Sequence, residues 1–355
     1  MTNGLKWLLK RAGKTQPRSM IVFSLLLSAT VLISFIIAFP QQTSAFFKII
    51  TAHSIHQPPS QEPAGIPMPD PKSLDGRKAL DEVSKLLALG QRCSGTDGAE
   101  RASKYIANRL KEIGLEPIID EFKDITPEGE KTFRNILGEL QGTRDSTIIL
   151  LSHYDTKSGI STDFTGANDS GSSTGLLLEL ARVLKQPKHG GATILFAFLD
   201  GEECLKEYSP SDGLHGSRRL AHTLVQNARA QKVTAAILID MIGDTNLNVG
   251  IPRNSSRHLT SILFEAAKEE NTRLNFSLSE NYVLDDHVPF LQAGMAAIDI
   301  IDFDYGSEPG KNDYWHTPKD TIDKIGSDSL QTVGRVVIRM LNKLCDVSPE
   351  SISDK

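Results

Sequence analysis

Cysteine and positive charge are both scarce in this sequence, and each shortage narrows the classes of protein to which it can belong. The 355 residues include three cysteines that form no Cys-x-x-Cys pair, which argues against a cysteine-based zinc site and leaves one disulfide open. The net charge is -5, so there is no surplus of lysine and arginine to bind a phosphate backbone. We therefore expect no nucleic-acid partner.

Long hydrophobic runs are also rare, and one that is long enough to cross a membrane lies near the N-terminus. Residues 20–39 carry no charge, and five lysines and arginines precede them in residues 1–19. About 20 apolar residues cross a bilayer as a helix, and basic flanks favour the cytoplasmic side. We expect a cytoplasmic basic segment at 1–19 and a transmembrane signal anchor at 20–39, with the rest of the chain in a periplasm, a lumen or the extracellular space. A signal peptide cleaved near Ala45 is the alternative, and it would secrete the domain.

The rest of the chain divides into a spacer, one large domain and a short tail. Six prolines between residues 53 and 72 predict an extended spacer at 40–72, which is followed by one large folded domain at 73–347 and a tail at 348–355. Strands alternate with helices in the domain, which predicts a three-layer α/β/α sandwich with a mostly parallel, mixed central sheet. Expected strands are 118–122, 135–139, 147–152, 192–199, 235–239 and 297–301; expected helices are 98–113 capped by Asp97, 172–184, and a last helix capped by Ser327.

Histidines and carboxylates directly follow several of the predicted strands. Because the carboxyl ends of parallel strands share one edge of a sheet, we expect these side chains to meet there. Crowded carboxylates repel one another unless a divalent cation joins them, and a mixture of imidazole and carboxylate ligands suits zinc. Adjacent glutamates also allow one to bind metal while the other moves protons. The candidate residues are His153, Asp169, Glu202, Glu203, Asp240, Asp285 and His316.

A second motif offers a different chemistry. Residues 171–175 match the Gly-x-Ser-x-Gly pattern of serine hydrolases, and Asp240 and His316 follow in the order that those enzymes use. The nucleophilic serine of that motif must come directly after a strand, however, and residues 166–170 do not form one. We expect instead that these small residues let a helix N-terminus pack closely beneath Asp169.

Taken together, the motifs resemble the zinc-dependent aminopeptidase family and its glutaminyl cyclase branch. The resemblance covers about residues 76–344 and is highly specific for the superfamily, although less so for the branch. The motifs that carry it are His-Tyr-Asp-Thr-Lys at 153–157, Gly-Ala-Asn-Asp-Ser at 166–170, Asp-Gly-Glu-Glu at 200–203, Ile-Asp-Met-Ile-Gly at 239–243, Asp-Asp-His-Val-Pro-Phe-Leu at 285–291 and Trp-His-Thr at 315–317.

The resemblance implies a role for each candidate residue. Asp169, Glu203 and His316 would hold the principal zinc, and Glu202 would be the proton shuttle. In two-zinc aminopeptidases the positions of His153 and Asp240 supply a second metal site. In one-zinc cyclases, Asp240 would instead join Asp285 in a hydrogen-bonded acid network. Two aromatic residues, Trp315 and Tyr208, would wall the substrate pocket.

Several segments favour the cyclase branch over the aminopeptidases. Lys157, the stretch at 208–218 and Trp315 are cyclase-like, although Tyr208 stands where the cyclase pattern has tryptophan. The cysteines that form a disulfide in animal cyclases align with Ser152 and Thr174, so that bridge is absent, and the loop after Lys157 is shorter.

The expected function is zinc-dependent conversion of N-terminal glutamine on peptides and proteins to pyroglutamate, with release of ammonia. The alternative is a two-zinc aminopeptidase that removes N-terminal residues from peptides. A non-catalytic surface receptor on the same scaffold is disfavoured, because Glu202 and all the metal ligands are retained.

Overall fold

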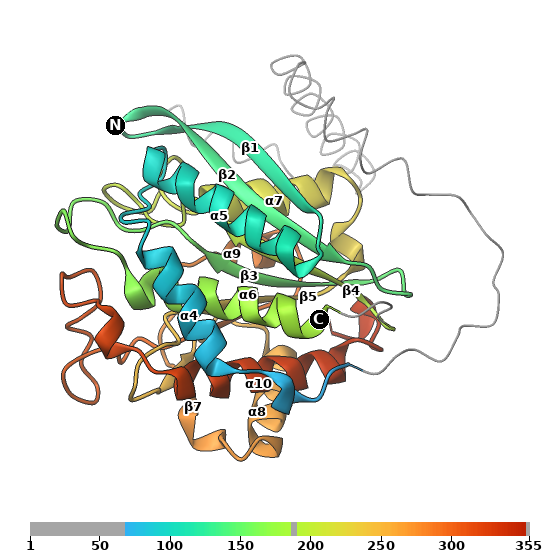
Figure 1. The fold of residues 1–355 in the computed structure, drawn as a ribbon. Coiled ribbons are helices and arrows are strands. Elements are labelled where there is room, and N and C mark those ends of the chain that lie inside the picture. Colours follow the sequence, from blue (N-terminus) through green and yellow to red (C-terminus); the bar gives the residue numbers. More distant parts are fainter. Residues whose placement is uncertain (1–67, 186–189, 353–355) are drawn as a thin grey trace, which may run out of the picture. The chain divides into compact units, whose positions relative to one another are not determined.

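The described part of the protein is built around one twisted sheet with helices on both faces. The structure is a computed structural model, and it describes residues 68–185 and 190–352 (Figure 1). The six strands lie in the order β1-β2-β4-β3-β5-β8. They are β1 (Pro117–Thr126), β2 (Gly129–Leu140), β3 (Thr147–His153), β4 (Thr193–Leu199), β5 (Val233–Asp240) and β8 (Ala297–Ile301).

The sheet is mixed, as the sequence predicts. Strands β4, β3, β5 and β8 run parallel, whereas β1 pairs antiparallel with β2, and β2 pairs antiparallel with β4. A separate parallel pair is formed by β6 (Val249–Ile251) and β7 (Phe276–Leu278). The predicted three-layer α/β/α architecture with a mostly parallel central sheet is therefore confirmed.

Helices cover the two faces of the sheet unequally. One face packs against α4 (Gly76–Leu87), α5 (Asp97–Ile113), α6 (Ser173–Leu184), α8 (Arg257–Glu269) and α10 (Ser327–Leu344); the other packs against α7 (His215–Gln226) and α9 (Val288–Gln292). Short turns of helix lie at Pro71–Ser73, Ala167–Ser172, Ala230–Lys232, Arg273–Asn275, Ile322–Lys324 and Pro349–Ser351. Along β3, Ile148 and Leu150 contact the first layer, while Ile149 and Leu151 contact the second.

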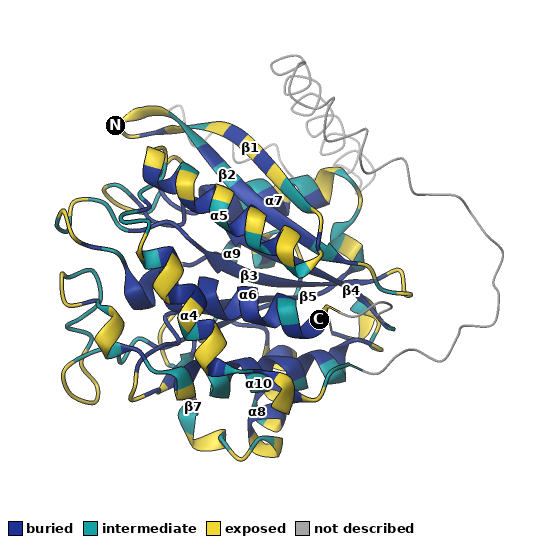
Figure 2. Ribbon diagram, in the orientation of Figure 1, coloured by how far each residue is buried: buried dark blue, intermediate teal, exposed yellow. Residues whose placement is uncertain are grey.

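Burial explains why the central strands appear in the sequence as unbroken apolar runs. Every residue of β3, β4 and β5 is buried, because side chains on both faces meet a helical layer. Figure 2 shows the central strands buried, with exposed residues on the outer sides of α4 and α5 and along β1. The outer strand β1 instead alternates buried and exposed positions over part of its length.

Local details depart from the prediction at the helix ends and in the first hairpin. The cap of α5 is Thr96, whose side chain accepts a hydrogen bond from the backbone N–H of Ala99, so the predicted cap Asp97 is the first helical residue. Likewise α10 begins at Ser327 and is preceded by Gly326, without a side-chain cap. Strands β1 and β2 extend beyond their predicted ends because they pair with each other from Pro117 and Gly138 as far as the turn between Thr126 and Gly129.

The predicted membrane location is corrected by the structure. Within residues 68–185 and 190–352, no helix is both long enough and apolar enough to cross a bilayer. The longest, α10, carries Arg335, Arg339 and Lys343, whose charges would have to enter the hydrocarbon. The run at 20–39, on which the prediction rested, lies outside the described residues, as do the segment at 1–19 and most of the spacer. The boundaries at 73 and 347 stay predictions.

Candidate active site

The candidate residues gather at the carboxyl edge of the parallel strands. His153 is the last residue of β3, Asp240 is the last residue of β5, and Glu202 and Glu203 follow β4 after a tight turn. The turn requires Gly201, because its φ of +77° is left-handed and a Cβ there would lie 2.6 Å from the ring of Phe133. Parallel register thus places an imidazole and three carboxylates at one rim.

Asp169 reaches the same rim from a π-helical turn, Ala167–Ser172, that leads into α6. Buried Asp320 anchors this turn: its carboxylate accepts the backbone N–H of Asn168 at 2.7 Å and that of Asp169 at 3.2 Å. The hydroxyl of Tyr305 donates to the same carboxylate at 2.7 Å. These contacts fix the backbone that carries Asp169.

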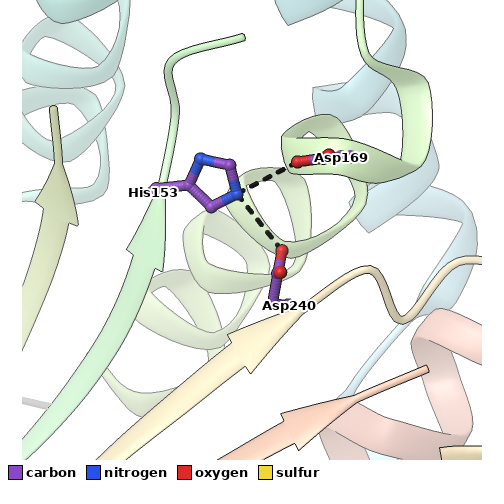
Figure 3. A group of neighbouring side chains, drawn as sticks. All are labelled: His153, Asp169 and Asp240. Carbon is purple, nitrogen blue, oxygen red and sulfur yellow. Dashed lines mark hydrogen bonds and ion pairs between the residues drawn. The ribbon is translucent and has the colours of Figure 1, made fainter. Parts of the chain in front are cut away.

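Two groups of potential metal ligands share Asp169. In the first, His316 Nε2 lies 2.9 Å from Glu203 Oε1 and 3.1 Å from Asp169 Oδ2. In the second, His153 Nε2 lies 3.2 Å from Asp169 Oδ1 and 3.3 Å from Asp240 Oδ1 (Figure 3). Within each group the ligand atoms lie within 4.8 Å of one another. The structure therefore brings together all five residues that the sequence singled out as metal ligands.

The chemistry of the first group fits a divalent cation. Two buried carboxylates and one partly exposed imidazole are a suitable ligand set for zinc. Glu203 Oε2 is buried without a hydrogen-bond partner among the described residues, although Lys157 Nζ lies 3.3 Å away. Lys157 offsets part of the charge on this buried oxygen, and a metal ion would supply the direct contact that it lacks.

Hydrogen bonds between the carboxylates and the imidazoles shift the pKa values in this cluster. Burial by itself would raise the pKa of Asp169, but the hydrogen bonds to His153 and His316 outweigh burial and lower it. Burial would lower the pKa of His316, whereas its contacts with Asp169 and Glu203 raise that pKa to about 9. Because a ligating imidazole must be neutral, metal binding at this cluster should release protons.

Glu202 lies beside this cluster but belongs to neither ligand group. It is 6% exposed, and the hydroxyl of Tyr208 donates to its Oε1 at 2.7 Å. Burial, followed by the negative charge of Glu203, raises the pKa of Glu202 well above its ordinary value. A buried carboxyl whose pKa is raised holds a proton more readily than an exposed glutamate does, which suits a group that accepts a proton and gives it back.

Asp155 has an orienting position that the sequence did not reveal. Its Oδ1 accepts the backbone N–H of Glu202 and its Oδ2 accepts that of Glu203, each at 3.2 Å. The same carboxylate lies 3.4 Å from His153 Nδ1. Asp155 is fully buried, and it links the strand end that carries His153 to the loop that carries both glutamates. The one feature of the sequence that could have indicated this role is that Asp155 belongs to the His-Tyr-Asp motif at 153–155.

A pocket of about 600 Å³ opens onto the metal cluster. Trp315 stacks on the ring of His316, with 4.0 Å between ring centroids, and Phe303 meets Trp315 edge-on.

Asp285 also lines the pocket, and burial, followed by the charge of Asp240, raises its pKa well above the ordinary value. Among the described residues no hydrogen bond joins Asp240 to Asp285 directly, and the Asp285 carboxylate accepts the backbone N–H of Asp286. The residues that line this pocket include Asp169, Glu202, Glu203, Tyr208, Asp240, Asp285, Trp315 and His316.

The serine motif at 171–175 lies away from solvent and has a packing role. Ser173 is fully buried at the start of α6, where its hydroxyl donates to the carbonyl of Ser170 and accepts from Ser152. No strand immediately precedes it, so it lacks the exposed turn of a hydrolase nucleophile.

The three cysteines, all within the described residues, form no disulfide.

Replacing Ser173 with alanine should therefore cost stability and spare catalysis. The variant loses a buried hydroxyl that makes two hydrogen bonds, which corresponds to about 1 kcal/mol of unfolding free energy. Activity per folded molecule should stay at the wild-type level, and a serine-directed phosphonate should not inhibit the enzyme. Denaturant unfolding and initial-rate assays on the same preparation measure both effects; an inactive but folded variant would restore the serine-hydrolase alternative.

Comparisons with known proteins agree on one family. The model of peptidase family M28 matches residues 135–341. A glutaminyl cyclase structure from an Acidobacteriales bacterium is 33% identical, covers 82% of this chain and 99% of its own, and superposes with a TM-score of 0.72. Glutaminyl-peptide cyclotransferase of Drosophila melanogaster is 26% identical over an alignment of 288 positions that covers 73% of this chain and 78% of the relative. The structure of a Zn-dependent exopeptidase from Parabacteroides distasonis, 24% identical over 79% of this chain and 99% of its own, has the same fold with a TM-score of 0.64.

Proposed function

Because this chain belongs to peptidase family M28 and, within it, to the glutaminyl cyclases, we propose that it converts the N-terminal glutamine of peptides and proteins to pyroglutamate and releases ammonia. One structural observation carries the proposal: a single pocket contains a buried carboxyl, Glu202, directly beside the cluster of Asp169, Glu203 and His316. A reaction at an amide carbonyl that uses no nucleophilic side chain of the protein requires a metal ion to polarise the carbonyl and a group to move the proton. This pocket contains ligands for the first and a candidate for the second.

Zinc is the cofactor that we propose for this cluster. Asp169, Glu203 and His316 would hold it, and their mixed nitrogen and oxygen donors are typical of zinc in enzymes. When bound, zinc supplies a Lewis acid that polarises the carbonyl of the substrate's side-chain amide.

Glu202 would carry the proton that the reaction moves. Ring closure forms a bond from the α-amino nitrogen to the side-chain carbonyl carbon and breaks the bond from that carbon to the amide nitrogen. The attacking amine loses a proton and the departing nitrogen gains one, so one carboxyl can serve both steps. Tyr208 holds Oε1 of Glu202, which fixes the carboxyl while it accepts and returns the proton.

The two remaining acids and the aromatic wall would position the substrate. Asp240 and Asp285 line the pocket beside Glu202, where their oxygens can accept hydrogen bonds from the N–H groups of the amine and the amide. Trp315 and Phe303 pack together at the pocket wall and would keep water from the reacting carbonyl. Exclusion of water favours ring closure, since water attacking the same carbonyl would hydrolyse the amide.

A two-metal aminopeptidase is the second candidate, and one observation favours it. His153, Asp169 and Asp240 form a complete second ligand group that shares Asp169 with the first. A second ion there would allow peptide hydrolysis by an activated water. The similarity to glutaminyl cyclases supports the first candidate over this one.

Product analysis separates the two candidates. The purified chain, supplied with zinc, is incubated with the peptides Gln-Ala-Ala and Leu-Ala-Ala, and the products are examined by mass spectrometry and an ammonia assay. We expect the first peptide to lose the mass of one ammonia and the second to stay intact. Release of free leucine or glutamine would reject cyclisation in favour of the aminopeptidase.

A further inference from the structure

The pocket continues past the metal cluster over a part of the fold that the proposed reaction does not use. Its outer half is formed by the β6–β7 pair, the segment after β7 and the segment after β8. We call this surface the outer shelf. Its polar positions, together with one glycine, are Asn248, Gly250, Ser277, Ser279, Asn281 and Asp304.

The outer shelf is held in one conformation by backbone hydrogen bonds. Fully buried Asp302 accepts the backbone N–H of Asn248 at 2.8 Å and that of Asp304 at 2.9 Å. The side-chain amide of Asn248 donates to Asp304 Oδ2. The backbone N–H of Ser279 donates to the carbonyl of Ile251 at 2.8 Å, which continues the β6–β7 ladder. A surface tied down in this way is pre-organised to bind a ligand.

The charge of the outer shelf should make it favour positively charged ligands over negatively charged ones. Asp304 is the one acidic side chain among these six positions, and the residues that line the pocket include no lysine or arginine, as far as the described chain shows. Asp304 is half-buried, and the partner that the structure gives its carboxylate is the neutral side-chain amide of Asn248. A carboxylate without a cationic partner, facing a concave surface, attracts a positively charged group and repels a negative one.

Pocket size indicates what the outer shelf holds. A volume of about 600 Å³ lies within the range of sites that enclose a ligand much larger than one side chain. In the proposed reaction the metal cluster and Glu202 contact only the N-terminal residue of the substrate, so most of the pocket volume is left for the residues that follow it. We propose that the outer shelf binds the second and third residues of the peptide, and that Asp304 makes the enzyme favour basic over acidic residues there. This inference rests on the proposed function and names its substrate class.

The test compares matched peptides and charge variants. We measure kcat/KM for Gln-Lys-Lys-Ala and Gln-Glu-Glu-Ala at low salt in the wild-type chain, in Asp304→Asn and in Asp304→Lys. The wild type should favour the lysine peptide by about fivefold, the scale of a partly exposed charge pair, mainly through KM. Asp304→Asn should bring the ratio close to one, and Asp304→Lys should invert it. Added salt should reduce the wild-type preference.

A charge removed elsewhere is the control. Asp145 precedes β3 at the opposite edge of the sheet and pairs with Lys232 at 2.8 Å. Asp145→Asn should keep the wild-type ratio. If the wild type processes both peptides equally, or if Asp304→Asn and Asp304→Lys keep its preference, the assignment of the outer shelf is wrong while the proposed function stands. If neither glutamine peptide is cyclised by the wild type, the proposed function itself fails.

Discussion

Replacing Glu202 with glutamine is expected to reduce kcat by about 100-fold to 10,000-fold, which is the range that general acid–base catalysis contributes. The change keeps the size of the side chain and the acceptor oxygen for Tyr208, but an amide cannot take up and return the substrate's proton. Glu202 is not one of the three ligands of the first cluster, so the metal should stay bound. Initial rates of ammonia release and zinc content, measured on one preparation, give both results.

The matched control for this variant is Glu207→Gln. Glu207 is exposed on the loop that follows the catalytic glutamates, so removing its charge should leave kcat near the wild-type value. Full activity in Glu202→Gln with zinc still bound would remove Glu202 from the mechanism. Loss of zinc in the same variant would mean that Glu202 is a ligand and that the division between the adjacent glutamates is wrong.

Replacing His316 with alanine is expected to abolish both zinc binding and activity. His316 is the one imidazole of the first cluster, and it contacts Asp169 and Glu203. Without it, two carboxylates remain, which form an incomplete set for zinc. Lewis-acid polarisation contributes several kcal/mol to the transition state, so at least about a hundredfold of the rate should be lost.

Three measurements define the outcome for His316→Ala. Zinc per chain is counted after dialysis, kcat/KM is measured with excess zinc, and circular dichroism shows whether the variant is folded. The control is His258→Ala, which removes an exposed imidazole from α8 and should retain zinc and activity. Treating the wild type with a chelator should reproduce the loss, and added zinc should reverse it. An active His316→Ala without zinc would refute the metal site.

The central part of the fold could be predicted from the sequence because burial on both faces leaves a distinct pattern. Strands β3, β4 and β5 are fully buried, and each was visible as a short apolar run that ends in a histidine or a carboxylate. The hairpin of β1 and β2 was predicted too short, since its outer part pairs with itself rather than with the core. The helix caps were misplaced by one residue, because Thr96 and Asp97 are both good caps and only the backbone angles decide between them.

The site was predicted for a related reason. His153 and Asp240 end strands and Glu203 closely follows one, so the order of the parallel sheet brings these three together. Asp169 and His316 come from a helical turn and a loop, and they were placed at the site by their motifs rather than by the sheet. Asp155 and Asp320 were missed as orienting residues, because their partners are backbone N–H groups of distant loops that have no sequence signature. The outer shelf was missed because β6 and β7 are three residues each, too short for a clear alternation.

The number of metal ions is the property that the residues alone leave open. Both ligand groups are complete and share Asp169, so the same side chains are compatible with one ion or with two. The proposed cyclase needs the group of Asp169, Glu203 and His316, whereas the aminopeptidase also needs His153 and Asp240. Cyclase and aminopeptidase therefore differ in how many of the two metal sites are occupied, and not in which ligand residues are present.

An anomalous difference map measured at the zinc absorption edge, from crystals of the active enzyme grown with zinc, tests this account most directly. The account predicts one strong peak that is bonded to Asp169, Glu203 and His316. A map of the active enzyme with no peak among these three side chains would contradict the metal site, and an equally strong second peak between His153 and Asp240 would contradict the one-metal cyclase.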